Sequence, residues 1–272
     1  MSFTEEQIER YSRHIILQEI GEEGQKKIFD SKILVVGLGG LGNPACLYLA
    51  AAGIGTLGIL DSDAVELSNL NRQILHTTED IGKDKVISTK EKINKLNKDV
   101  KVITHKTKFT VDNAMEIIKD YDFVIDGSDN FSTKFLINDA CVLLDKPFSH
   151  AGVLRFDGQS ITVIPNKTPC YRCIFPDMPP RDVIPTSQQA GVLGVVPGVL
   201  GTIQALEALK FVLGKGDLLT GRLFVFDALK LTVRIIEIKK NENCKICGNG
   251  PEILRLESKN YIEKVLYCSP ET

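Results

Sequence analysis

The sequence of 272 residues lacks a cluster of basic side chains. Its formal net charge is −2 and its pI is about 6.1. A protein that binds nucleic acid usually presents a basic face, and no run of lysine and arginine predicts such a face here. We therefore do not expect nucleic acid as a partner.

Long uninterrupted apolar segments are also missing. The first nine residues contain three glutamates and no apolar core, so they do not resemble a secretory signal. The most apolar stretch, residues 190–214, is interrupted by Pro197, Gly198, Gln204, Glu207 and Lys210. The last three recur at helical spacing, which favours a buried amphipathic helix over a membrane span. We expect no membrane contact and a cytoplasmic location.

A disulfide framework is not expected either, because a chain without a secretory signal stays in a reducing compartment. Seven cysteines are present: Cys46, Cys141, Cys170, Cys173, Cys244, Cys247 and Cys268. Two Cys-x-x-Cys pairs, Cys170 with Cys173 and Cys244 with Cys247, suit a closed tetrahedral Zn²⁺ site with a structural role. The alternative is a redox-active pair, which a single Cys-x-x-Cys would favour.

The sequence does contain a regular alternation of predicted strands and helices. Strands are expected over residues 33–36, 56–60, 101–104, 123–125 and 147–151, and helices over residues 41–52, 83–96, 111–118 and 131–144. This alternation predicts βαβ units, and so an α/β fold whose Rossmann-like parallel sheet carries helices on both faces. Helices over residues 5–17 and 24–29 are expected before the first strand.

The pattern changes after Gly152. A strand within residues 155–164, a proline-rich loop over 175–194, a helix over 197–213 and a hairpin over 221–238 are predicted. We therefore expect antiparallel strands and the four-cysteine zinc site to extend the parallel sheet.

A glycine-rich turn joins the first strand of the alternation to its helix. Gly37, Gly39 and Gly42 match the pattern G-x-G-x-x-G, with Gly40 among them. Such a turn lets the backbone approach a phosphate at the positive N-terminus of a helix. Asp61 follows at a strand end, where a carboxylate can hold ribose hydroxyls. The motif alone would favour NAD.

The next segment argues for a triphosphate instead. Residues 61–74 gather polar side chains: Asp61, Asp63, Ser68, Asn69, Asn71, Arg72 and Gln73. The Arg72 guanidinium can make paired contacts with phosphate oxygens. Lys85 stands near a predicted helix start, an unfavourable place for a cation unless an anion lies there. Asp129 and Asn130, after another strand, add a carboxylate of the kind that holds Mg²⁺ beside phosphates.

Seven motifs together resemble the ubiquitin-activating E1-like superfamily: RYSRHIIL, GLGGLG, DSDAVELSNLNRQ, GKDK, DGSDN, PCYRC and CKICG. The most similar branch contains the molybdopterin-synthase and thiamine sulfur-carrier adenylyltransferases, the HesA/MoeB/ThiF family. The resemblance implies ATP-dependent adenylation of the C-terminal glycine carboxylate of a small ubiquitin-like sulfur-carrier protein, with release of pyrophosphate. The pathway, whether molybdopterin, thiamine or cysteine synthesis, stays open.

The resemblance also implies roles for individual residues. The glycines would pack against ATP, Asp61 would hold its ribose, and residues 68–72 would line the nucleotide. Arg72 and Lys85 would contact the phosphates, while Asp129 would bind Mg²⁺. Arg13 would reach the terminal phosphates in the partner subunit's site, which requires a homodimer.

The resemblance also implies a division of the chain into three parts. Residues 1–30 would form N-terminal helices for the dimer and partner-site contact, residues 31–248 the adenylation domain with its zinc site, and residues 249–272 a tail. The carrier's last glycines would approach residues 190–194, and the strands and helix after Gly152 would provide its docking surface.

One position departs from the family. Relatives in the thiamine branch carry a cysteine where Ser187 follows Thr186. A serine hydroxyl forms neither a persulfide nor a disulfide, so we expect no covalent sulfur relay there and a separate sulfur donor. Cys268 could supply a thiol, whereas Cys46 and Cys141 fall in predicted helices and are expected in the core.

Three alternatives remain. An NAD-dependent oxidoreductase is disfavoured by the set Arg72, Lys85 and Asp129, and because no hydride-transfer pair stands out among four scattered histidines, His14, His76, His105 and His150. A tRNA-modifying dehydratase of the same superfamily would need a basic face. A non-catalytic partner subunit would not need the full set of ATP residues.

Overall fold

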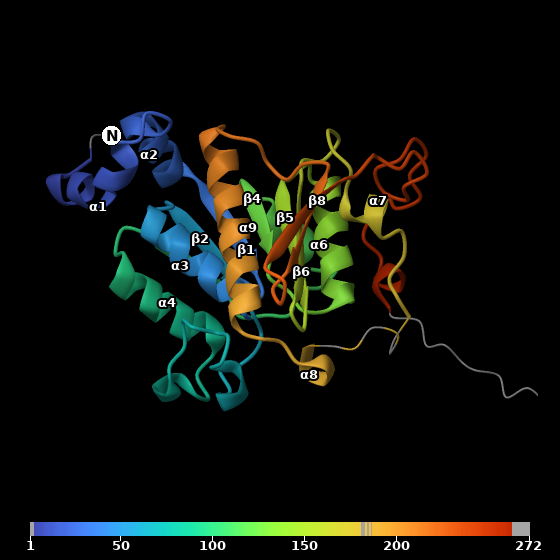
Figure 1. The fold of residues 1–272 in the computed structure, drawn as a ribbon, viewed down its shortest axis with the longest axis horizontal. Coiled ribbons are helices and arrows are strands. Elements are labelled where there is room, and N and C mark those ends of the chain that lie inside the picture. The colour runs from blue at the N-terminus through green and yellow to red at the C-terminus, as the bar shows by residue number, and fades with distance from the viewer. Residues whose placement is uncertain (1–2, 181–182, 184, 186, 263–272) are drawn as a thin grey trace, which may run out of the picture.

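The computed structural model describes residues 3–180, 183, 185 and 187–262. Its strands are β1 Lys32–Val36, β2 Thr56–Leu60, β3 Lys101–His105, β4 Phe123–Asp126, β5 Phe148–Leu154, β6 Asp157–Val163, β7 Arg222–Asp227 and β8 Thr232–Glu237. Within the described residues they form one eight-stranded sheet in the order β3-β2-β1-β4-β5-β6-β7-β8 (Figure 1). Strands β1 to β5 pair in parallel, and β6 to β8 continue the sheet antiparallel. The predicted fold class is confirmed.

Helices cover both faces of this sheet. They are α1 Glu5–Ile15, α2 Gly21–Asp30, α3 Gly42–Ala52, α4 Lys85–Leu96, α5 Ala114–Ile118, α6 Phe131–Leu143, α7 Tyr171–Ile174, α8 Ser187–Ala190 and α9 Val195–Leu213. Short 3₁₀ helices occupy Leu67–Asn69, Thr78–Asp80 and Ser258–Tyr261.

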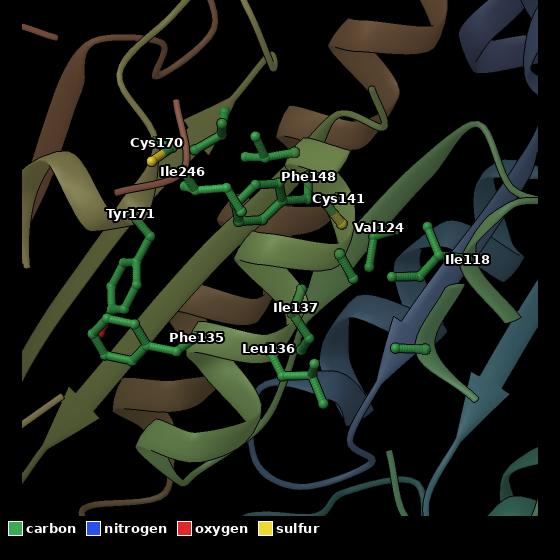
Figure 2. Packing of buried hydrophobic residues seen from close by; sticks show 14 of the residues in the cluster. Ile118, Val124, Phe135, Leu136, Ile137, Cys141, Phe148, Cys170, Tyr171 and Ile246 are labelled. Carbon is green, nitrogen blue, oxygen red and sulfur yellow. The ribbon is translucent and has the colours of Figure 1, made fainter. Parts of the chain in front are cut away.

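Alternate residues of the parallel strands serve two hydrophobic cores, because successive side chains point to opposite faces of a sheet. Leu34 and Val124 join the core that includes α5 and α6, while Ile33 joins the core that includes α3, α4 and α9. Figure 2 shows the first core, in which Phe135 of α6 lies beside Tyr171 of α7. Burial on both faces explains why these strands are almost continuously apolar in sequence.

Some helix boundaries differ from the predicted ones. Helix α5 begins at Ala114 and not at residue 111, because the Asn113 side chain accepts a hydrogen bond from Thr110 N and donates to Lys108 O. An asparagine side chain that bonds to nearby backbone competes with the helix. The predicted loop over residues 175–194 contains the short helix α8.

Helix α9 is the one described helix whose length and composition would suffice to cross a membrane. It packs against α3, β5 and β6, and two of its polar side chains bond to the sheet. Gln204 Nε2 donates to the carbonyls of Asp126 and Ser149, and Glu207 Oε2 accepts from Thr162 Oγ1 at 2.6 Å. Gln204 and Glu207, two of the polar residues that interrupt the apolar stretch, therefore tie α9 to the sheet that it covers.

Helices α1 and α2 lie near the edge of the sheet where the parallel strands begin (Figure 1). Tyr11 is buried against Gly53, which shortly precedes β2, and its hydroxyl accepts a hydrogen bond from Asn97 Nδ2 at 2.8 Å. The glycine turn lies at the opposite edge, where the parallel strands end.

Candidate nucleotide site and four-cysteine cluster

The glycine loop, residues 37–42, connects β1 to α3. Gly37 has a φ of +92°, and a Cβ there would lie 2.8 Å from Gly127 O. At Gly42 a Cβ would lie 2.0 Å from Gly37 O. At Gly39 the nearest atom to a Cβ would be Gly127 O at 4.0 Å. The fold therefore requires the first and last glycines, whereas Gly39 leaves space beside the loop for a ligand.

At the start of α3, Asn43 N donates to Gly39 O and Ala45 N donates to Leu41 O, while Pro44 has no N–H. No side chain caps this helix within the described residues, and the first amides of a helix carry partial positive charge. Asn43 holds the loop in place, because its Nδ2 donates to Leu38 O and its Oδ1 accepts from Leu75 N. This fully buried residue was missed in the sequence, where only its polarity within an apolar helix marks it.

Asp61 follows β2, and its carboxylate faces the glycine loop. It accepts hydrogen bonds from Leu38 N at 2.8 Å and Asp63 N at 2.9 Å. Burial raises the pKa of Asp61, while Lys85 and these two backbone donors oppose the rise. The predicted ribose-binding carboxylate is thus held rigidly beside the phosphate-binding turn.

Lys85 is the buried first residue of α4. Its Nζ lies 3.0 Å from Asp63 Oδ2 and 3.9 Å from Asp61 Oδ1. The anions beside this cation are therefore two carboxylates of the chain itself. The Asp63 side chain is 66% exposed, whereas the Asp61 side chain is only 10% exposed, so Asp63 is the partner of Lys85 that solvent reaches.

Arg72 carries a charge that no carboxylate of the described residues neutralises. A Cβ on Gly40 would lie 3.5 Å from Arg72 Cγ, so this side chain borders the glycine loop. Its Nη1 donates to the neutral acceptors Ser68 O and Asn71 Oδ1 at 2.9 and 3.1 Å. A guanidinium that has no carboxylate partner favours a phosphate as its partner.

The other predicted nucleotide-lining residues differ in their surroundings. The Ser68 hydroxyl donates to Glu66 Oε2, and Asn69 Oδ1 accepts from Glu66 N at 3.1 Å, which shapes the turn. Gln73 is buried, and its Oε1 has no hydrogen-bond partner in the part of the chain that the structure describes. A buried unpaired acceptor is unfavourable, so Gln73 Oε1 has unused hydrogen-bonding capacity.

The acidic loop, residues 126–130, lies directly against the glycine loop. A Cβ on Gly127 would lie 2.6 Å from Gly37 O, and Gly127 N donates to Val36 O. Asp129 and Asn130 are exposed, and Asn130 Oδ1 caps α6 by accepting from Thr133 N at 2.9 Å. This packing brings the predicted Mg²⁺ ligand to the same edge of the sheet as Lys85 and Arg72.

Arg13 does not lie at the same edge of the sheet as Lys85, Arg72 and Asp129. It is exposed on α1, near the edge of the sheet opposite the glycine loop. Its predicted role in a partner subunit's site stays a prediction.

Residues 190–194 do approach the site. A Cβ on Gly194 would lie 2.1 Å from Asn71 O and 3.1 Å from Arg72 Cβ, so this segment packs on the residues that carry the guanidinium. Ser187 begins α8, but its side chain lies outside the described residues, as do Thr186 and Cys268.

The four-cysteine cluster forms away from the strand ends, between α7 and the segment after β8. Its sulfur atoms, from Cys170, Cys173, Cys244 and Cys247, lie within 4.8 Å of one another, with contacts of 3.4 to 4.0 Å. Tetrahedral Zn–S bonds of about 2.3 Å would place thiolates about 3.8 Å apart, so this donor set fits zinc. Cys46 and Cys141 are fully buried in the hydrophobic cores, as predicted.

Two glycine substitutions should distinguish a glycine that folding requires from a glycine that ATP binding requires. Gly42→Ala is expected to lower the free energy of unfolding by about 3 kcal/mol, because its Cβ overlaps Gly37 O. Gly39→Ala should leave stability within about 0.5 kcal/mol of wild type and weaken ATP binding about tenfold. Urea unfolding and calorimetric titration measure the two effects. Gly250→Ala, with no atom within 4 Å of its Cβ, is the control; unchanged ATP affinity in Gly39→Ala would contradict the assignment.

Buried His76 predicts that the fold loses stability in acid. Burial lowers its pKa from 6.5 to about 4, with Asp80 opposing this shift and Lys85 and Lys92 adding to it. Between these values the unfolded chain binds a proton that the folded chain does not, so the free energy of unfolding falls as pH falls. The loss between pH 7.5 and 4 should be about 3 kcal/mol from this group. Urea unfolding should show a shallower pH dependence for His76→Gln; equal slopes would contradict the prediction.

Comparisons with known proteins find similar sequences and a similar fold. The sequence pattern of the ThiF family matches residues 11–246. The chain is 44% identical over 257 residues to the sulfur carrier protein adenylyltransferase of Thermus thermophilus, covering 92% of this chain and 94% of that protein. It is 46% identical over 264 residues to the adenylyltransferase and sulfurtransferase MOCS3 of Aedes aegypti, covering 97% of this chain and 59% of the longer protein. The fold is similar to that of E. coli MccB crystallised with ATP, with a TM-score of 0.77 at 24% identity over 88% of this chain and 75% of that one.

Proposed function

Because this chain belongs to the ThiF family, we propose that it adenylates the C-terminal glycine carboxylate of a small ubiquitin-like sulfur-carrier protein, using ATP and releasing pyrophosphate. The observation that carries the proposal is the pair of cations, buried Lys85 and unneutralised Arg72, beside the glycine loop. A pair of cations there suits the three phosphates of ATP. The identity to a sulfur carrier protein adenylyltransferase supports the choice of substrate.

In this reaction the carrier carboxylate attacks the α-phosphorus of ATP, and the bond to the leaving pyrophosphate breaks. Catalysis then depends on position and charge, and needs no covalent nucleophile on the enzyme. Asp61 would orient the ribose, while Lys85 and Arg72 would stabilise charge on the phosphates. The exposed Asp129 carboxylate is the group that would hold Mg²⁺, which would neutralise the leaving pyrophosphate.

The carrier's tail would reach the site along residues 190–194. Gly194 packs on Asn71, so a tail beside this segment would end next to Arg72. With a serine at residue 187, the acyl-adenylate would be the final product on this enzyme, and a separate sulfur donor would attack it. The Ser187→Ala variant is accordingly expected to keep adenylation activity.

A homodimer would complete the site if Arg13 of one subunit reaches the phosphates bound by the other. The exposure of Arg13 and its distance from the glycine loop of its own chain support this arrangement. The four cysteines would hold a structural Zn²⁺.

Pyrophosphate exchange into ATP tests the proposal directly. The purified chain should catalyse exchange only when Mg²⁺ and its cognate carrier are both present, and a carrier that lacks its last glycine should be inactive. Carriers for molybdopterin, thiamine and cysteine synthesis, assayed in turn, would identify the pathway. NAD binding without ATP binding would overturn the proposal in favour of an oxidoreductase.

A further inference from the structure

A buried charged network lies where β4 ends, beside the third residue of β5, and includes the first residue of the acidic loop. Asp126 is fully buried, and its Oδ1 accepts hydrogen bonds from Ser128 N at 3.0 Å and Ser128 Oγ at 2.5 Å. Its Oδ2 accepts from His150 Nδ1 at 2.7 Å and Lys134 Nζ at 3.3 Å. One carboxylate therefore ties the acidic loop to β5 and to α6.

The surroundings of Asp126 and His150 shift the pKa of each of these two side chains. Burial would raise the pKa of Asp126, but Lys134, His150 and Ser128 together hold it at about 2, so the carboxylate is ionised. Burial and Lys134 lower the pKa of His150, while its hydrogen bond to Asp126 opposes this shift. Nδ1 faces the ionised Asp126 carboxylate, which can only accept, so Nδ1 is the donor. His150 Nε2 is buried and has no hydrogen-bond partner among the described residues.

Ring packing on Tyr171 also holds the His150 side chain in place. The Tyr171 ring lies against it, with the ring centroids 4.2 Å apart. Tyr171 stands between two members of the four-cysteine cluster, Cys170 and Cys173. Figure 2 shows Cys170 and Tyr171 in the same core, next to α6.

The backbone around Tyr171 is anchored to α6 as well as to the cysteines. Tyr171 N donates to Asn138 Oδ1 at 2.9 Å, and the Arg172 guanidinium forms a buried two-point ion pair with Asp139, both contacts at 2.7 Å. The ring position of Tyr171 is thus set by the cluster on one side and by α6 on the other.

We infer that Tyr171, His150 and Asp126 are positioning residues that transmit the order of the four-cysteine cluster to the acidic loop and so to Asp129. The chain of contacts is continuous: the cluster places Tyr171, Tyr171 supports His150, His150 orients Asp126, and Asp126 fixes Ser128 next to Asp129. The inference rests on the proposed function, because it places the acidic loop in the nucleotide site. It gives the cysteines a second role beyond joining α7 to the segment after β8.

A pair of substitutions at His150 tests whether this side chain orders the acidic loop. His150→Leu removes the donor to Asp126 at similar size, and His150→Asn keeps a donor near the position of Nδ1. Loss of one charge-assisted hydrogen bond should speed amide exchange in residues 126–130 about tenfold in His150→Leu, and His150→Asn should restore it. KM for ATP should rise about tenfold while kcat changes less than about threefold.

His105→Leu is the matched control. His105 bonds to Tyr121 and makes no hydrogen bond to the acidic loop in the described structure. It should leave exchange in residues 126–130 unchanged. Equal acceleration in this loop and in β1 for His150→Leu would indicate general destabilisation and overturn the inference, as would unchanged exchange in the loop.

A second pair of substitutions tests the link to the cysteines. Tyr171→Leu keeps all four cysteines, so elemental analysis should still find one zinc per chain. It should nevertheless speed amide hydrogen exchange in residues 126–130. Phe175→Leu removes another ring that packs on Tyr171, at a centroid distance of 5.0 Å, and should not do so. The double variant Tyr171→Leu with His150→Leu should be no worse than His150→Leu alone; additive effects would overturn the inference.

The exchange measurements use the protein without nucleotide. They therefore test the inference even if pyrophosphate exchange fails for every carrier, in which case the proposed function falls by itself.

Discussion

Replacing Lys85 by alanine is expected to lower kcat for adenylation about 10³-fold, with a much smaller change in KM for ATP. Lys85 is buried, so its charge acts on the phosphates with little screening by water. Its removal would also leave Asp61 and Asp63 without their lysine partner in the nucleotide site. Arg72 and Mg²⁺ would remain as counter-charges to the leaving pyrophosphate, but two carboxylates without a paired cation would oppose them. Single-turnover formation of the acyl-adenylate measures the effect.

Lys106→Ala is the matched control for this experiment. Lys106 pairs with Asp84, directly before α4, but its side chain is 58% exposed. An exposed pair contributes little, so kcat should stay within about twofold of wild type. A Lys85→Ala enzyme with near-normal kcat would remove this lysine from the catalytic residues and contradict the proposed mechanism.

Removal of zinc is expected to lower the unfolding temperature by about 10 °C or more. The cluster joins α7 to the segment after β8, and both pack in the core that contains α6. Without the metal, four cysteine side chains would crowd one site with no ion to hold them together. Thermal unfolding before and after chelation, with zinc content measured on the same samples, checks the effect.

Cys173→Ala and Cys46→Ala form a matched pair. The first should lose zinc and stability together, whereas the second removes a core thiol and should keep one zinc per chain. A chain that binds no zinc and forms a disulfide within a Cys-x-x-Cys pair would favour the redox alternative.

The glycine loop illustrates how much of the site can be predicted from local sequence. Strand, turn and helix are neighbours in the chain, so the spacing of Gly37, Gly39 and Gly42 is sufficient to predict their conformation. Asp61 is also predictable, because parallel strands bring their carboxyl ends to one edge of the sheet. The spacing within each Cys-x-x-Cys pair likewise predicts a metal-binding pair, whereas the meeting of Cys170 and Cys244, 74 residues apart, depends on the tertiary structure.

Lys85 illustrates where prediction from sequence is incomplete. Its place at a helix start predicts an anion, but the chain supplies two carboxylates of its own. Asn43 and the network of Asp126, Lys134 and His150 were missed for a related reason. Each of them acts on residues that lie far away in the sequence, such as Leu75 for Asn43.

The sequence by itself determined the order of strands and helices, the phosphate-binding turn and the two cysteine pairs, because each depends on residues within one or two elements. Only the tertiary structure decided which buried side chains contact the acidic loop, which carboxylates pair with Lys85, and that Arg13 lies at the edge of the sheet opposite the glycine loop of its own chain. Those outcomes depend on contacts between segments that packing of the sheet and its helices brings together, and no local pattern of residues specifies such contacts.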